Sequence, residues 1–205
     1  MRRILTVLLC TVMLFASFAS GVRVSAADIT HTVVKGDTMW RIAVRYEVGI
    51  SELKRANTGI KNYDLIYPGQ RINIPALDSS VGAYEREVVR LVNEIRKERG
   101  LSELVHDWEL SRVARYKSQD MRERGYFSHT SPTYGSPFDM MRSFGISYRT
   151  AGENIAKGYK SPEAVVDGWM SSSGHRANIL NSSFTHIGVG YVTDGSYWTQ
   201  MFVGR

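Results

Sequence analysis

Cysteine is nearly absent from this 205-residue chain. The single one, Cys10, lies inside an apolar run near the N-terminus. If that run is removed after secretion, the remaining chain has no thiol. Disulfide bridges, thiol catalysis and zinc bound through cysteine are then excluded, and a secreted domain of this kind has to be held together by its hydrophobic core.

Acidic side chains are absent from residues 1–26, which contain three arginines. Arg2 and Arg3 precede the apolar run of residues 4–18, and Val24-Ser25-Ala26 supplies small residues at its end. This order predicts a secretory signal peptide over residues 1–26, with cleavage before Ala27. The run is too short for a comfortable membrane span, so no stable span is expected after cleavage, although an uncleaved anchor is the alternative.

Basic tracts and nucleic-acid motifs are also absent. The formal net charge is +6, and +3 remains once the three arginines of the predicted signal are set aside. This mild excess is compatible with an anionic cell-wall surface and gives no reason to expect a nucleic-acid partner.

Residues 31–76 form a compact unit. An apolar stretch at 31–35 predicts a strand, and Thr38 is placed to cap a helix that runs to about residue 46. A second short helix is expected over 51–57, and a second strand over 71–75. The predicted order is strand, helix, helix, strand, with His31 near the surface.

This unit resembles a LysM domain. The residues that carry the resemblance are Val33 to Ala43, then Ile50, Leu53, Ala56, Asn57, Leu65 to Gln70, Ile72, Ile74 and Pro75. The resemblance implies binding of N-acetylglucosamine glycans such as peptidoglycan. It places the groove between Gly36, Asp37, Thr38 and Met39 on one side and Leu65, Ile66 and Tyr67 on the other. The alternative is that Asp37 and Thr38 only cap the helix and that Ile66 only fills the core.

A linker over residues 77–82 leads to a second domain over 83–205. An amphipathic helix is predicted over 81–99, and its charged face, including Glu85, is expected to be solvated. Three further helices begin at Asp107, Ser136-Pro137 and Ser161-Pro162.

The last part of the chain changes period. Alternating apolar residues at 187–192 and 197–202 flank Asp194-Gly195, which predicts a β-hairpin. Helices followed by a hairpin indicate an α+β domain, in which helices cover an antiparallel sheet.

Three polar segments of this domain contain candidate functional residues. They are residues 125–132 with His129, residues 151–155 with Glu153, and residues 168–180 with His175. Each is rich in glycine, serine or proline, so we expect a polar cleft built from loops. His31, His106 and His186 are interpreted as surface or structural residues.

The second domain resembles the bacterial form of the CAP superfamily, also called the SCP or PR-1-like fold. The residues that carry the resemblance are Asn93, Arg96, Gly100, Leu101, Ala114, Asp120, Met121, Tyr126 to Pro132, Gly152 to Ile155, Gly168 to Met170, Ser173 to Leu180, Gly188 to Tyr191 and Trp198 to Phe202. The resemblance implies an α-β-α sandwich. It implies a cleft with His129, Glu153 and His175, while Ser172 stands where many eukaryotic members have a second acid.

Two chemistries remain open for this cleft. His129 and His175 could hold Zn²⁺ or another divalent metal, with Glu153 as third ligand or as base for a bound water, which would give a hydrolase. Alternatively, the three residues form a hydrogen-bonded cluster that binds a ligand without turnover.

The two resemblances together imply a secreted envelope protein of spore-forming Gram-positive bacteria, at the cell wall or spore envelope. We expect LysM to anchor it on peptidoglycan and the CAP domain to be a binding or regulatory module. The alternatives are a metal-dependent hydrolase of a cell-wall or peptide substrate and, third, a sterol- or lipid-binding domain.

Overall fold

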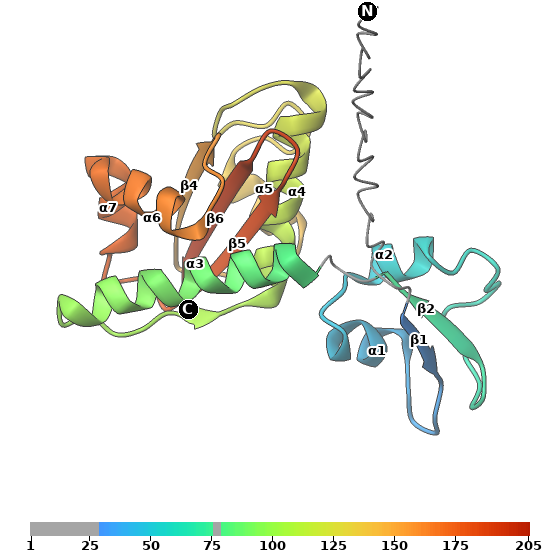
Figure 1. The fold of residues 1–205 in the computed structure, drawn as a ribbon. Helices are drawn as coiled ribbons and strands as arrows, with labels where there is room; N and C mark the ends of the chain where they lie inside the picture. Colours follow the sequence, from blue (N-terminus) through green and yellow to red (C-terminus); the bar gives the residue numbers. More distant parts are fainter. Residues whose placement is uncertain (1–28, 76–78) are drawn as a thin grey trace, which may run out of the picture.

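The computed structural model describes residues 29–75 and 79–205, which form two domains (Figure 1). The predicted signal peptide at 1–26 lies outside the described residues. Among the helices that the structure does describe, none has both the length and the apolar character needed to cross a membrane.

The N-terminal domain contains two strands and two helices. In chain order they are β1 (Ile29–Thr32), α1 (Met39–Arg45), α2 (Ile50–Arg55) and β2 (Arg71–Ile74). β1 and β2 are antiparallel, which confirms the predicted order of elements. The first strand begins and ends earlier than predicted. Val33 nevertheless stays beside the second strand, because its N–H donates to the carbonyl of Gln70 at 2.8 Å.

Local chemistry explains the helix α1. The Thr38 side chain accepts a hydrogen bond from the Arg41 N–H at 3.1 Å, which satisfies one of the free donors at the helix start. Met39, Ile42 and Ala43 then face inward. The core of the domain consists of Val33, Met39, Ile42, Ala43, Leu53, Ile72 and Ile74.

His31 is a correction to the sequence prediction. It is buried rather than near the surface. Its Nε2 lies 2.7 Å from Asp37 Oδ2, and its Nδ1 lies 3.1 Å from the Tyr46 hydroxyl. A histidine can be buried when both of its ring nitrogens have hydrogen-bond partners. The sequence alone does not show that Asp37 and Tyr46 lie close enough to His31 to be those partners.

The C-terminal domain is an α-β-α sandwich, as the CAP resemblance implied (Figure 1). Helices α3, α6 and α7 lie on one side of the sheet, and α4 and α5 lie on the other. The elements are α3 (Ser79–Glu98), β3 (Val105–His106), α4 (Trp108–Arg124), α5 (Pro137–Ser143), β4 (Thr150–Lys157), α6 (Pro162–Ser171), α7 (Ser173–Ile179), β5 (His186–Val192) and β6 (Tyr197–Gly204).

The sheet has the order β3-β5-β6-β4. The predicted hairpin is present as β5 and β6, which pair antiparallel from His186 opposite Val203 to Val192 opposite Tyr197. β4 adds antiparallel to β6 at one edge. β3 adds parallel to β5 at the other edge, so the sheet is mixed rather than purely antiparallel as predicted.

The predicted caps of the later helices are confirmed. The carboxylate of Asp107 accepts from the Leu110 N–H, and Gly125 ends α4 in the left-handed conformation at φ 67°. Ser136 and Asp139 form a reciprocal capping box at the start of α5. Ser161 caps α6 through the Ala164 N–H.

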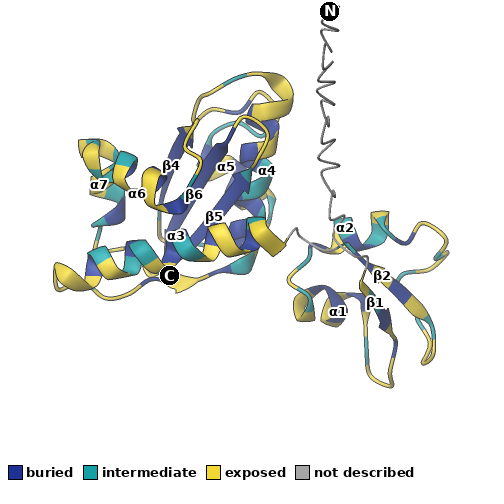
Figure 2. Cartoon of the chain, in the orientation of Figure 1, coloured by how far each residue is buried: buried dark blue, intermediate teal, exposed yellow. Residues whose placement is uncertain are grey.

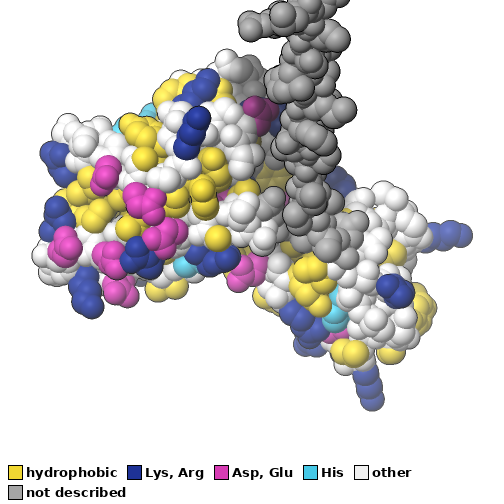
Figure 3. Space-filling view, in the orientation of Figure 1, with side chains coloured by type: hydrophobic (Ala, Val, Ile, Leu, Met, Phe, Trp, Pro, Cys, Tyr) yellow, Lys and Arg dark blue, Asp and Glu magenta, His cyan; other side chains and the backbone are white. Residues whose placement is uncertain are grey.

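Two predictions about the first helix of this domain are corrected. α3 begins at Ser79, so residues 79–82 of the predicted linker are helical. Glu85 is 1% exposed rather than solvated. The Arg115 guanidinium and the Tyr191 N–H both donate to its carboxylate, which makes this burial tolerable. Arg96 is also buried, and its guanidinium donates to the carbonyls of Ile179 and Asn181. Acidic and basic side chains alternate along the exposed part of α3 (Figure 3).

Burial is concentrated in the central strands of this sandwich (Figure 2). Every residue of β6 is buried, because helices cover both faces of the sheet. One core lies on the α3 and α6 side and includes Trp169, Trp198 and Phe202. The other lies on the α4 and α5 side and includes Met140 and Met201. β4 lies at the sheet edge and packs against both cores, through Ala156 on one side and Ala151 on the other.

Candidate functional site

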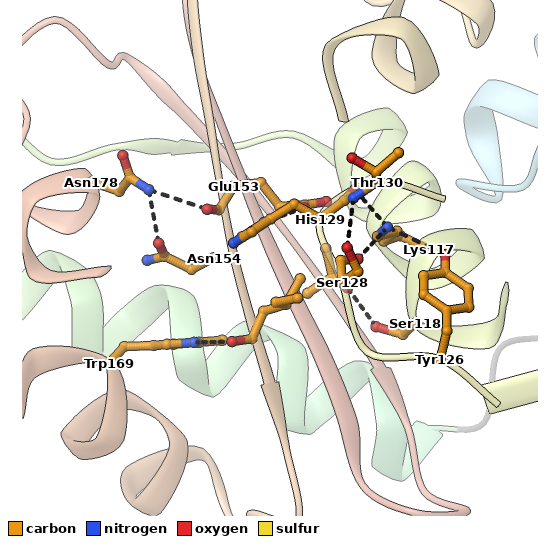
Figure 4. A network of polar contacts seen from close by, with 12 residues as sticks. Lys117, Ser118, Tyr126, Ser128, His129, Thr130, Glu153, Asn154, Trp169 and Asn178 are labelled. Carbon is orange, nitrogen blue, oxygen red and sulfur yellow. Dashed lines mark hydrogen bonds and ion pairs between the residues drawn. The ribbon is translucent and has the colours of Figure 1, made fainter. Parts of the chain in front are cut away.

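The Gly152-Glu153-Asn154 segment lies in a strand and not in a loop. It forms the middle of β4, where Glu153 is opposite Met201 and Asn154 is opposite Gln200. Successive side chains of a strand point to opposite faces. Glu153 therefore points toward the α4 side of the sheet and Asn154 toward the α7 side, as Figure 4 shows.

Glu153 is a buried carboxylate with one paired oxygen. Its side chain is 1% exposed, and its Oε1 lies 2.7 Å from Nδ1 of His129, whose side chain is 52% exposed. Its Oε2 is buried and has no hydrogen-bond partner among the described residues. Burial raises the pKa of Glu153, and the His129 contact and the Lys117 charge offset only part of that rise.

The loop that carries His129 is organised by Asp120 of α4. Its carboxylate accepts hydrogen bonds from the hydroxyls of Tyr126, Ser131 and Thr133 at 2.6 to 2.7 Å. Burial opposes ionisation of this carboxyl, but the hydrogen bonds, led by that of Thr133, hold its pKa below the usual value. An ionised Asp120 thus fixes the loop by local contacts, so the His129 ring is held in place beside Glu153.

Lys117 is a site residue that sequence reasoning missed. It is fully buried, and its Nζ donates to the carbonyls of Ser128 and His129, each at 2.8 Å (Figure 4). Burial lowers the pKa of Lys117, while the charges of Glu153 and Asp120 oppose that change. A signal was present in the sequence. Lys117 occupies the inward stripe of α4 between Leu110 and Met121, where a lysine needs buried partners.

His175 lies on α7 and not in a loop, and α7 is joined to β4 by two asparagines. Asn154 Nδ2 donates to the His175 carbonyl at 3.1 Å. Asn178 Nδ2 donates to the Glu153 carbonyl and to Asn154 Oδ1, at 3.2 and 2.8 Å. Burial lowers the pKa of His175, and so does the charge of His129, so the two imidazoles lie in each other's field. The structure therefore gathers His129, Glu153 and His175 around β4.

A metal ion was one expectation for this cluster. Within residues 29–75 and 79–205, no group of three or more His, Cys, Asp or Glu side chains is arranged to hold a metal ion. The contact with Glu153 occupies Nδ1 of His129 and leaves Nε2 as the ring nitrogen that a metal could use, while Ser172 supplies no carboxylate. The described residues therefore do not form a three-ligand metal site.

The predicted glycan groove lies where two loops of the N-terminal domain meet. The Gly69 N–H donates to the Val33 carbonyl at 2.8 Å, which holds the loop after β1 against the loop before β2. Leu65 and Tyr67 expose 52% and 59% of their surface. The Gly36 backbone is exposed as well, in a left-handed conformation at φ 93° that favours glycine.

The remaining predicted groove residues are engaged within the domain. The side chain of Met39 fills the core, and Thr38 caps α1. Ile66 packs partly against the same core. The Asp37 carboxylate accepts from the Val34 N–H and contacts His31 and Arg45, and the Val34 hydrogen bond is the main cause of its lowered pKa. Of the predicted groove residues, Gly36, Thr38, Leu65 and Tyr67 are exposed.

Both domains match known protein families. The LysM domain family matches residues 31–75, and the Cysteine-rich secretory protein family, also called CAP, matches residues 89–204. YkwD of Bacillus subtilis is 66% identical over 127 residues, which cover 62% of this chain and 49% of YkwD. The chain thus spans about half the length of this curated relative.

Shorter matches involve two proteins with spore-related names. SpoIVD-associated factor A of Bacillus subtilis is 48% identical over 46 residues, which cover 22% of this chain and 12% of that protein. Spore coat assembly protein ExsA of Bacillus cereus is 38% identical over 71 residues, which cover 33% of this chain and 11% of that protein.

A solved structure supports the same assignment. An extracellular protein of Bacillus anthracis that contains an SCP domain is 34% identical and superposes with a TM-score of 0.59, over 67% of this chain and 47% of that chain. The CAP match covers more than half of the chain, so this protein belongs to the Cysteine-rich secretory protein (CAP) family and has a LysM domain ahead of its CAP domain.

Proposed function

We propose that this protein is a secreted envelope protein, anchored on N-acetylglucosamine glycans by LysM, whose CAP domain binds a polar ligand without turning it over. The LysM family match and the spore-related names of two relatives support a location at the cell wall or spore envelope. Peptidoglycan is the glycan that this location supplies.

The CAP part of the proposal rests on the hydrogen bonding of the two carboxylate oxygens of Glu153. One oxygen is hydrogen-bonded to His129, while the other is buried and has no donor within the described parts of the chain. An unpaired buried acceptor costs on the order of 1–3 kcal/mol, which a ligand or water with an N–H or O–H donor would relieve. The proposed ligand is therefore a polar group that donates to this carboxylate and contacts the exposed His129 ring.

Catalysis has less support from the same residues. Glycoside hydrolysis normally uses two carboxyl groups on either side of the bond. Asp120, whose charge acts on Lys117 together with that of Glu153, already accepts from three hydroxyls. Ser172 stands where the family resemblance places a second acid in many eukaryotic members. The metal-dependent hydrolase remains the alternative, and release of wall fragments would reveal it.

The anchoring part is tested by removing the exposed aromatic side chain of the groove. We expect Tyr67→Ala to weaken cosedimentation of residues 27–205 with peptidoglycan about tenfold, the equivalent of about 1.4 kcal/mol of lost apolar contact. Trp40→Ala is the matched control, because Trp40 is an equally exposed aromatic residue on α1 outside the two groove loops. Equal binding by wild type and Tyr67→Ala would contradict the groove assignment.

A further inference from the structure

One carboxylate joins the two domains. Glu52 of α2 accepts a bidentate pair of hydrogen bonds from Arg112 of α4, with Nε at 2.7 Å from Oε1 and Nη2 at 3.0 Å from Oε2. The Tyr116 hydroxyl donates to the same Oε1 at 2.5 Å. Arg55 Nη2 in turn donates to that hydroxyl at 2.6 Å. Ser51 of α2 also accepts from Arg112 Nη2 at 3.0 Å and donates to Glu52 Oε2 at 2.7 Å, so three residues of LysM and two of the CAP domain form one hydrogen-bonded cluster.

This cluster is partly enclosed. The side chains of Arg112 and Glu52 are 19% and 22% exposed. The Arg112 guanidinium also lies over the rings of Tyr116 and Phe144, with centroid distances of 5.5 and 5.2 Å. A planar guanidinium that forks onto a carboxylate and stacks on aromatic rings is held more firmly than an exposed lysine pair. The contact is therefore a specific junction and not a loose surface pair.

Gly49 gives an independent indication that the sequence accommodates this junction. It is buried at the N-cap of α2, with an ordinary φ of −71°, so its backbone does not require glycine. A Cβ at this position would lie 2.0 Å from Glu52 Oε2 and 2.1 Å from Arg112 Nε. The two side chains can meet over the helix start only because no side chain occupies position 49.

We propose that Glu52, through Arg112 and Tyr116, clamps the LysM domain onto the CAP domain, so that the two move as one body in solution. Helix α4 connects this junction with the candidate site. The same helix carries Lys117 and Asp120, which hold the His129 loop. A glycan held by LysM would then always meet the CAP site in one orientation. This inference concerns the junction alone and needs neither ligand.

Backbone ¹⁵N relaxation of residues 27–205 tests the clamp, because it reports how fast each domain tumbles. We expect wild type to show one rotational correlation time for both domains. Glu52→Gln removes the charge, and Gly49→Ala displaces the two side chains without changing any charge. In both variants we expect the two domains to have different rotational correlation times, with the shorter one for LysM. Gly59→Ala is the matched control in the same domain, because a Cβ there has no atom of residues 29–75 or 79–205 within 4 Å.

Exchanging the charges of Glu52 and Arg112 gives a second test. Recovery in the double variant would show that loss of coupling in a single variant is not caused by misfolding. Glu52→Arg and Arg112→Glu should each uncouple the domains, and the two together should restore a shared correlation time. Separate tumbling of the domains in wild type, or shared tumbling in Glu52→Gln and Gly49→Ala, would overturn the proposal. Failure of the clamp is distinguishable from failure of glycan anchoring, because sedimentation with peptidoglycan depends on the groove loops and not on Glu52.

Discussion

Glu153 combines two features that seldom occur together in one side chain: a buried carboxylate and, among the described residues, an oxygen without a partner. The family resemblance was sufficient to single out Glu153, His129 and His175, and the structure gathers them around one strand. The residues that hold them are less visible in sequence. Lys117 acts through the carbonyls of a loop, and no spacing rule connects a helix residue with the backbone it supports.

Glu153→Gln tests the burial of this charge. Because the pKa of Glu153 is raised, the folded protein keeps this proton to a higher pH than the unfolded chain does. The associated stability is present below the unfolded-state pKa and is lost as pH rises through the folded-state pKa. Urea unfolding from pH 4 upward should show a steeper loss of stability in wild type than in Glu153→Gln. An unchanged slope would contradict the raised pKa; Glu163→Gln, at an exposed position of α6, is the control.

Lys117→Met tests the support of the His129 loop. The substitution keeps much of the volume but leaves the carbonyls of Ser128 and His129 without their donor. We expect a loss of about 2 kcal/mol in the free energy of unfolding, together with increased mobility of the His129 ring by NMR. Lys97→Met on the exposed part of α3 should change stability by less than about 0.5 kcal/mol. A Lys117→Met protein as stable as that control would rule out this role.

At the level of elements, the sequence predicted most helix starts and the final hairpin, because caps and alternation are local signals. It did not predict β4. The segment reads as a turn from its glycine and asparagine, and it becomes a strand only by pairing with β6, more than forty residues further along the chain. α7 was missed for a related reason, since its start at Ser173 lacks a side-chain cap.

Gly152 permits the close contact between β4 and its neighbours. A Cβ there would lie 2.9 Å from the Phe184 ring and 3.1 Å from Asn178 Oδ1. We expect Gly152→Ala to destabilise the fold by about 1–3 kcal/mol and to disturb the asparagine contacts that place His175. Gly174→Ala on α7 is the control, because a Cβ there has free space and alanine favours the helix. Thermal unfolding of the two variants compares them directly, and equal midpoints would contradict the packing argument.

At the level of the whole molecule, the domain order was predictable, but the junction between the domains was not. Glu52 and Arg112 lie sixty residues apart in sequence, and each reads as an ordinary surface charge. In the sequence, Gly49 is consistent with the start of a helix and nothing more. Only the structure shows that a Cβ at this position would meet Arg112 of the CAP domain.

The junction should persist over a wide range of pH. Although burial opposes ionisation, the hydrogen bonds from Arg112, Tyr116 and Ser51 lower the pKa of Glu52 to about 2. A lowered pKa means that the contribution is present above the unfolded-state value and is lost as pH falls toward about 2. Small-angle X-ray scattering should therefore give the same radius of gyration from pH 8 to pH 5. Expansion within that interval would contradict the assigned ionisation.

We propose that LysM anchors the chain on the wall while the CAP site binds a ligand without turnover. The most direct measurement is an incubation of residues 27–205 with peptidoglycan, with and without Zn²⁺, that quantifies both sedimented protein and soluble fragments. We expect the protein to sediment with the wall and the amount of soluble fragments not to exceed that of the buffer control, with or without Zn²⁺. Fragments that appear with wild type and vanish with His175→Ala would contradict it and establish the hydrolase.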